Sequence, residues 1–312
     1  MIEALRTSPT WQAFRRDTAA VSGALLLALL VIAAVAGALA TNLAGVLDPA
    51  EVRLMDKLRT PLSAPSSTLD EQLRPALGVY LLGTDDLGRD VFARMLQGAV
   101  VSLSIGFVAM SISVVVGVVL GALAGFYGER RLGPVRVDSV IMRFTDVMLC
   151  FPSFFLVLTV IALLPPSIYY IMAVLGLTGW MGIARFVRAE FLSLRRQDFV
   201  LAARACGIGP RRLILVHLLP NAMGPVLVSA TIAVASAILT ESALSFLGFG
   251  VQPPQATWGN ILADGRAYVF DAPWLFFIPG GAIFAVVLAF NLLGEGLREA
   301  SDPRFRHTRS TR

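Results

Sequence analysis

Long runs of uncharged, mainly apolar residues alternate with shorter polar segments along this chain of 312 residues. An α-helix needs about 20 residues to cross roughly 30 Å of hydrocarbon, and each run is longer than that. The runs occupy residues 18–47, 95–128, 147–184, 213–240 and 272–294. The pattern therefore predicts an all-α membrane protein that crosses the bilayer several times.

The third run is long enough for two membrane spans. Pro165 and Pro166 end one helix there, and the Ser167 side chain can cap the next. The first run is expected to be a retained span, because it is too long for a signal peptide and lacks a clean cleavage site before Asp48. The sequence thus predicts six transmembrane helices, at about 19–40, 101–126, 139–164, 168–189, 222–246 and 274–296.

Lysine and arginine are distributed unequally between two alternating sets of loops. Of 26 such residues, 19 lie in segments 1–20, 126–146, 185–221 and 298–312, and 7 lie in 41–97 and 249–273. Because positive residues are retained on the cytoplasmic side, both termini are expected to be cytoplasmic. The net charge of +5 follows from this bias, so membrane lipid is an expected partner and nucleic acid is not.

The composition of the chain argues against a metal site or a nucleotide-binding site on it. With 56% hydrophobic and 15% charged residues, two histidines and two cysteines, it lacks the ligands for a structural metal site. Its single lysine, Lys57, is not part of a phosphate-binding G-x-x-x-x-G-K-[ST] motif. We expect no cofactor on this chain, and any ATP must be bound by another chain.

The basic loop of residues 185–221 contains a short, alanine-rich helix. Asp198 is expected to cap this helix and Gly207 to end it. Ala202, Ala203 and Cys206 fall on one face, where small side chains let the groove of another protein approach closely. The alternative is a plain positive loop interrupted by prolines.

Two further patterns concern the packing of helices. Gly117, Gly121 and Gly125 recur every four residues and predict a flat stripe for close helix contact. Asp90 can cap the second helix and form an i,i+4 ion pair with Arg94.

Charged residues near or within the spans are expected to be paired. Arg143 with Asp146, and Glu295 with Arg298, lie one turn apart near the cytoplasmic ends of their helices and are predicted structural ion pairs. Glu241 is a carboxylate within the fifth helix. It could line a translocation path and meet a peptide amino group or a cation, or it could be protonated or hydrogen-bonded to a neighbouring helix.

The basic loop resembles that of the permease subunits of binding-protein-dependent ABC importers. That family has an E-A-A…G…I-x-L-P motif, and this chain matches its spacing with Ala202, Ala203, Gly207, Leu219 and Pro220. Leu201 stands where the family has its acidic residue, and His217 where it has isoleucine. The ATPase groove is therefore expected to accept this helix mainly by shape.

The resemblance extends beyond the loop and is to the peptide and nickel branch of the family. Asn221 completes an L-L-P-N sequence that is similar to that branch. Other segments that resemble it are residues 82–90, 142–146, 241–250 and 291–304.

The resemblance implies a type I ABC importer permease with no catalytic residues of its own, in the bacterial inner membrane. It implies three kinds of partner chain: a second homologous permease, two ATPase subunits or domains that bind ATP and Mg²⁺, and an extracytoplasmic solute-binding protein. Di- or oligopeptides are the implied substrates, with nickel or another small solute as the alternative. The coupling loop would comprise Leu201, Ala202, Ala203, Arg204, Gly207, Leu219 and Pro220.

The chain is predicted to fall into three parts. Residues 1–97 hold the first helix and an irregular outside loop, residues 98–298 the five-helix core with its docking loop at about 190–221, and residues 299–312 a basic tail. Two other classes stay open on the residues alone. A secondary transporter would need ion sites at broken helices, and a membrane scaffold would not need an intramembrane carboxylate.

Overall fold

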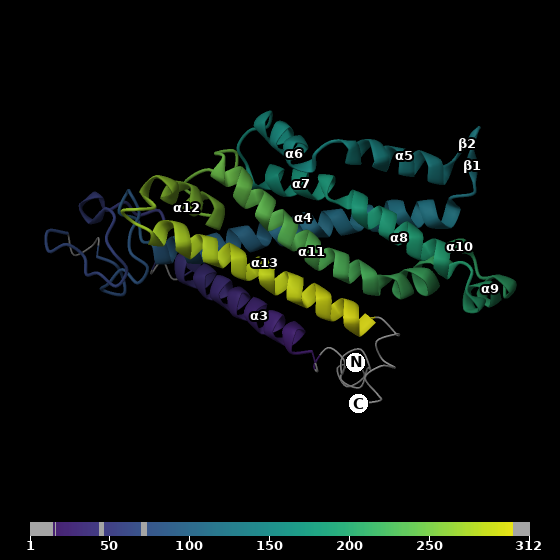
Figure 1. Cartoon of the computed structure of the whole chain (residues 1–312), viewed down its shortest axis with the longest axis horizontal. Helices are drawn as coiled ribbons and strands as arrows, with labels where there is room; N and C mark the ends of the chain where they lie inside the picture. The colour runs from purple at the N-terminus through teal and green to yellow at the C-terminus, as the bar shows by residue number, and fades with distance from the viewer. Residues whose placement is uncertain (1–14, 16, 44–46, 70–73, 302–312) are drawn as a thin grey trace.

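The computed structural model describes residue 15 and residues 17–43, 47–69 and 74–301. The predicted basic tail lies outside these residues, apart from its first members. The long helices form one elongated bundle (Figure 1). They are α3 (Thr18–Ala38), α4 (Val91–Tyr127), α5 (Val137–Cys150), α6 (Ser153–Ala162), α7 (Ile168–Thr178), α8 (Trp180–Leu194), α11 (Leu219–Phe246) and α13 (Trp274–Ser301).

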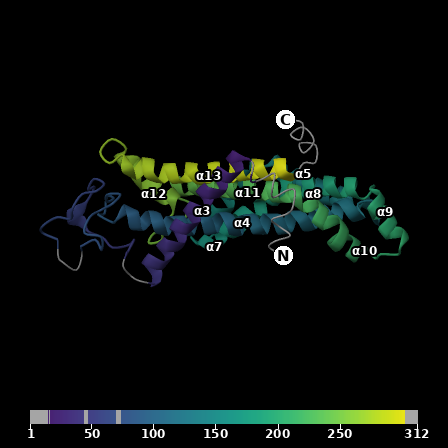
Figure 2. The ribbon, with the colours of Figure 1, turned by 90° about the horizontal axis from the view of Figure 1, so that it is seen from below.

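Helix α4 is the centre of the bundle and contacts α3, α7, α8 and α11. Helix α3 packs on α13 and α4 and crosses them obliquely (Figure 2). The irregular loop of residues 47–90 and the short helix α12 (Trp258–Gly265) lie at one end, here named the loop end. Helices α9 (Asp198–Ala205) and α10 (Pro210–Arg212) lie at the opposite end, here named the α9 end (Figure 1).

Among the described residues, five helical segments are long and apolar enough to cross a membrane, and a bent pair makes a sixth. Helices α7 and α8 together form one of the five, so the predicted span at 168–189 is present. Ser167 caps α7, as expected, by accepting a hydrogen bond from the Tyr169 amide. The predicted span 139–164, however, is not one straight helix.

The break lies between α5 and α6, whose axes differ by 81°. Phe151 adopts an extended conformation with φ −82° and ψ 131°, as a residue before proline prefers. Pro152 then begins the next helix without an amide hydrogen to continue the first. The prediction of one helix was wrong because this single proline was not counted as a helix breaker.

The glycine stripe of α4 packs directly against α8. A Cβ added to Gly121 would lie 2.5 Å from the Ala184 carbonyl oxygen, and one added to Gly125 would lie 2.6 Å from the Phe191 Cβ. Gly117 meets Ile183 in the same way. The prediction of close helix contact is therefore confirmed, and any larger side chain at these positions would push α4 and α8 apart.

The loop of residues 47–90 is irregular in its described residues, 47–69 and 74–90, as predicted, but it is organised around one buried carboxylate. Asp56 is fully buried and accepts hydrogen bonds from the Tyr80 hydroxyl at 2.7 Å and the Ser66 amide at 3.0 Å. Burial, followed by the hydrogen bond to Asp56, raises the pKa of Tyr80 far above its usual value. This polar centre gives the loop a fixed conformation against the helix bundle.

Helix α4 begins earlier than predicted. It starts at Val91, with Asp90 as the cap that accepts a hydrogen bond from the Phe92 amide at 2.8 Å. The proposed domain boundary at residue 98 therefore falls inside this helix. Helix α12 was not predicted as a helix, although the Thr257 side chain and Asn260 form a capping box at its start.

Candidate functional site

The basic loop folds as a short helix, a turn and a second helix start at the α9 end. Helix α9 covers Asp198–Ala205, and its N-cap is Gln197, which makes no side-chain cap hydrogen bond. The prediction that Asp198 caps the helix was wrong by one position. As the first helical residue, the Asp198 carboxylate still lies where a negative charge favours the helix dipole.

Gly207 ends α9 as predicted, through a Schellman motif. Its φ is +76°, in the left-handed region that glycine adopts most easily. The Ile208 amide donates to the Ala203 carbonyl at 3.1 Å, and the Gly207 amide to the Arg204 carbonyl at 2.9 Å. Pro210 then opens α10 at its first turn, where no amide hydrogen is needed.

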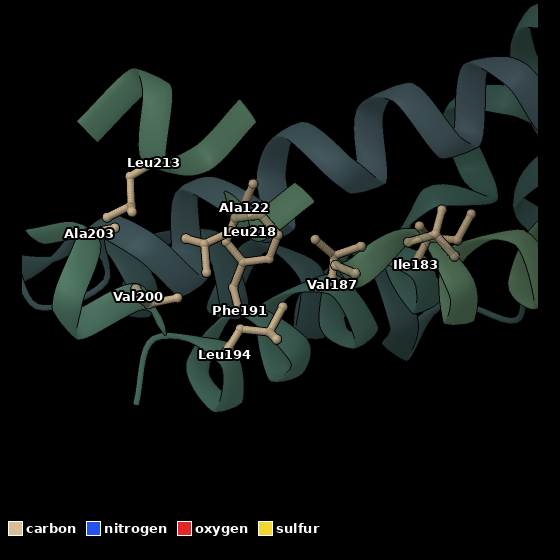
Figure 3. Packing of buried hydrophobic residues seen from close by; sticks show 11 residues of the cluster. Ala122, Ile183, Val187, Phe191, Leu194, Val200, Ala203, Leu213 and Leu218 are labelled. Atoms are coloured by element: carbon tan, nitrogen blue, oxygen red, sulfur yellow. The ribbon is translucent and has the colours of Figure 1, made fainter. Parts of the chain in front are cut away.

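One face of α9 packs on the protein itself. Val200 is fully buried and Ala203 is 8% exposed, and both join an apolar cluster with Phe191, Leu213 and Leu218 (Figure 3). The sequence placed Ala203 on the face offered to a partner, and that placement was wrong. Its small side chain instead lets α9 lie close to the ends of α8 and α11.

The opposite face of α9 is open to solvent. Leu201 is 49% exposed, and Ala202 is exposed as well. Arg204 and Gly207 are also exposed, but the Arg204 guanidinium lies over the Phe126 ring at the end of α4 and not on this face. Pro220, at the start of α11, is exposed, whereas Leu219 is half-buried. The candidate coupling residues are thus brought to one end of the molecule, but they divide into a buried anchor and an exposed contact face.

The predicted ion pair between Arg143 and Asp146 was wrong. Among the described residues, Asp146 pairs instead with Arg185 of α8, and Asp138 pairs with Arg188, whose Nη2 lies 2.6 Å from the carboxylate. Arg143 lies on an exposed part of α5. Both carboxylates face α8, and the two pairs join α5 to α8.

The second predicted ion pair, between the described residues Glu295 and Arg298, is not formed. Within the described part of the chain, no ion pair connects these two side chains, and both are exposed on the last turns of α13. Exposed side chains gain little from pairing in water, which removes the reason for a fixed contact.

Glu241 lies in the interior of the chain. It is 0% exposed, and the Ser245 hydroxyl donates a hydrogen bond to its Oε1 at 2.7 Å. Helix α12 packs closely at this point, because a Cβ on Gly259 would lie 2.7 Å from the Ser242 Cα. This hydrogen bond of Glu241 is therefore made within α11 and not to a neighbouring helix, and a role in a translocation path stays a prediction.

The sequence is similar to those of a known family of membrane proteins. The family of binding-protein-dependent transport system inner membrane components matches residues 117–307. The chain belongs to this family. It is a multi-pass inner membrane permease of an ABC importer, and a permease of this kind is a transport component without catalytic activity of its own.

Several curated relatives are similar over most of their length. The dipeptide transport system permease protein DppC of Alkalihalophilus pseudofirmus is 38% identical over 82% of each chain. The di/tripeptide transport system permease protein DppC of Pseudomonas aeruginosa is 39% identical over 95% of this chain and 92% of its own. The oligopeptide transport system permease protein OppC of Bacillus subtilis is 40% identical over 75% and 74%.

A solved structure shares the fold. The MetNI methionine ABC transporter, in an inward-facing conformation, matches with a TM-score of 0.52 and 17% sequence identity. The match covers 66% of this chain and 95% of that one. The permease therefore has the type I importer fold.

The loop end of the permease holds a buried ion cluster. Asp85 is fully buried, and its Oδ2 lies 2.5 Å from Arg94 Nη1 and 2.7 Å from Arg89 Nε. Both arginines also reach Asp264, at the end of α12. The predicted pair of Asp90 with Arg94 was wrong, because the Asp90 carboxylate caps α4 while Arg94 faces Asp85.

This cluster supplies the partners of Asp85. Sequence reasoning missed it because Asp264 is distant along the chain and α12 was not predicted as a helix. The capping box at Thr257 and Asn260 was the signal that could have found α12. Among the described residues, no group of three or more His, Cys, Asp or Glu side chains could hold a metal ion.

Proposed function

We propose that this permease imports di- or oligopeptides as one of two homologous but different membrane subunits. The other partners are two ATPase subunits or domains, which bind ATP and Mg²⁺, and an extracytoplasmic solute-binding protein. Support for peptides comes from the relatives, which are named as dipeptide, di/tripeptide and oligopeptide permeases. This chain binds no cofactor in the scheme.

The observation that carries the proposal is the geometry of α9. One of its faces is anchored in the apolar cluster of Val200 and Ala203, and the other presents Leu201 and Ala202 to solvent. A movement imposed on the exposed face is therefore transmitted through close packing to α8 and α11. We propose that the ATPase grips this face, and that its closure shifts the core helices between inward and outward access.

The orientation follows from the same proposal. The α9 end carries most of the arginines of the loops and faces the cytoplasm, so both termini are cytoplasmic. The loop end then faces outward and meets the binding protein. Membrane lipid covers the apolar sides of the spans.

The test is a substitution on the exposed face of α9. Ala202→Arg adds a long side chain where the ATPase groove would close, but it does not disturb the buried anchor. In the reconstituted complex we expect at least a tenfold loss of ATPase stimulation by the peptide-loaded binding protein, with the complex still assembled. Ala202→Ser, which keeps a small side chain at the same position, is the matched control and should leave coupling unchanged.

Two outcomes would contradict the proposal. If Ala202→Arg leaves peptide-stimulated ATPase activity as in the control, α9 is not the coupling element. If the binding protein stimulates only when it carries a nickel chelate and never with di- or oligopeptides, the permease is correct but the substrate is wrong.

A further inference from the structure

A cavity of about 340 Å³ lies beside α9, between the helix and the rest of the bundle. Three elements form its walls: the end of α4 with the residues that follow it, the residue after α8, and the stretch from α9 to Leu213. Its charged lining consists of Arg130, Arg195, Arg204 and Glu129. Three positive groups and one negative group therefore face the same cavity, which is open to solvent.

Two of the arginines are held in place by aromatic rings. The guanidinium carbon of Arg130 lies 4.7 Å from the centre of the Tyr127 ring, and that of Arg204 lies 5.5 Å from the centre of the Phe126 ring. Such contacts use the flat face of the guanidinium and leave the N–H groups at its edge free to donate. The rings thus preorganise two hydrogen-bond donors.

Arg195 is fixed in a different way. Its Nη1 donates to the Gly125 carbonyl at 3.0 Å and its Nη2 approaches Glu129 at 3.3 Å, and its side chain is 16% exposed. The Glu129 side chain is 80% exposed, so solvent screens its charge strongly. The single carboxylate therefore does not neutralise the three arginines.

We propose that this cavity binds a phosphate-bearing anion, which accepts hydrogen bonds from Arg130, Arg195 and Arg204. A fork of guanidinium donors matches the oxygens of phosphate better than a single ammonium would. The cavity lies at the ends of membrane-spanning helices, and Ile208, Pro210 and Leu213 give it an apolar wall. The phosphate can come from an anionic lipid headgroup or from a soluble phosphate.

An anion bound in this cavity would connect three elements that otherwise touch mainly through apolar contacts. Arg204 belongs to α9, Arg195 follows α8 and Arg130 follows α4. An anion shared by the three arginines would hold α9 against the ends of the other two helices.

The lipid arm of the test uses the full-length chain in nanodiscs of phosphatidylcholine with a minor fraction of phosphatidylglycerol. Native mass spectrometry measures how many phosphatidylglycerol molecules remain bound to the protein. The Arg130→Gln/Arg204→Gln double variant should weaken retention at least about tenfold, since it removes two charged donors. The matched control is Arg211→Gln/Arg212→Gln, which removes two exposed charges in α10.

The second arm uses inorganic phosphate with the same proteins in pure phosphatidylcholine, and reads the rise in the thermal unfolding temperature. If the wild type binds phosphate but not phosphatidylglycerol, and only the Arg130→Gln/Arg204→Gln variant loses this binding, the result supports the site and identifies a soluble source of the phosphate. Binding of phosphatidylglycerol alone identifies the lipid.

Two results would overturn the proposal. Equal losses in the two double variants would mean that the arginines attract anions only diffusely. The absence of binding of either probe to the wild type would mean that there is no site. Arg130 and Arg204 are exposed, so both variants should unfold at the wild-type temperature without ligand, and this is checked first.

Discussion

Two ion pairs of the bundle differ in their exposure to water. At the loop end, the side chains of Asp85 and Arg94 are almost completely buried and bonded to each other. Towards the α9 end, Asp146 and Arg185 are paired, but more than half of each side chain is exposed. Removing charges from water is costly, so a buried pair persists only if each group stays fully satisfied. An exposed pair contributes little to stability. The loop end therefore depends on its ions, and the α9 end does not.

The α9 end is held together by close packing instead. The glycines of α4 bring it into direct contact with α8, and the apolar cluster around Phe191 anchors α9. Its ion pairs are more exposed than the pair of Asp85 with Arg94, as the side-chain exposures of Arg188 with Asp138 and of Arg195 with Glu129 show. The loop end is therefore held by buried ions, whereas the α9 end is held by close packing of apolar side chains.

The largest expected effect comes from Arg94→Ala. The change leaves Asp85 buried with only Arg89 beside it, and breaking a buried ion pair in this way costs about 3–5 kcal/mol. The free energy of unfolding, from SDS titration followed by tryptophan fluorescence, measures the loss. Arg211→Ala, at the exposed α9 end, is the control and should change stability by less than about 0.5 kcal/mol. Equal effects of the two substitutions would remove the contrast between the ends.

Near the α9 end, the free energy of unfolding should depend on the volume of the packed side chains rather than on their charge. Gly121→Ala places a methyl group 2.5 Å from the Ala184 carbonyl oxygen, which cannot move without shifting α8. Overpacking of this kind costs about 1–3 kcal/mol in the same unfolding measurement. Gly182→Ala in α8 has no neighbour within 4 Å and should be neutral or slightly stabilising. A neutral Gly121→Ala would show that the two helices can separate easily.

Local features of the structure could be predicted from the sequence, and contacts between distant segments could not. Five continuous spans, the glycine stripe, the Ser167 and Asp90 caps and the Gly207 stop each depend on residues that lie close together in the sequence. The partner of Arg94 depends on where α12 lies, and that of Asp146 depends on how α5 meets α8. These arrangements are set by packing, so the sequence predicted that charges would pair but assigned the wrong partners.

The same limit applies to the candidate coupling site. Spacing placed Ala202 and Ala203 together on a face offered to a partner, and α9 was correctly predicted as a helix. Which face turns inward depends on Phe191, Leu213 and Leu218, which lie on either side of α9 in the sequence and meet only in the fold. Ala203 therefore became an anchor, and the exposed Leu201 became part of the contact face.

The smallest expected effect concerns Asp86, a partly buried carboxylate beside the ion cluster. Burial, and then repulsion from Asp85 and Asp264, raises its pKa above the usual 3.8. The folded protein thus holds this proton more tightly than the unfolded chain does, and stability falls as the pH rises from about 3.8 through the raised pKa.

Asp86→Asn removes this charge and should stabilise the permease at pH 7 by about a few tenths of a kcal/mol, since solvent screens part of the repulsion. The gain should vanish below pH 3.8, where the wild-type carboxyl is also neutral, so unfolding free energies are compared at both pH values. Glu129→Gln at the α9 end, where the side chain is 80% exposed, should give no gain at either pH. A gain at Asp86 that does not change with pH would arise from packing, and the charge of this residue would then have no part in the contrast between the two ends.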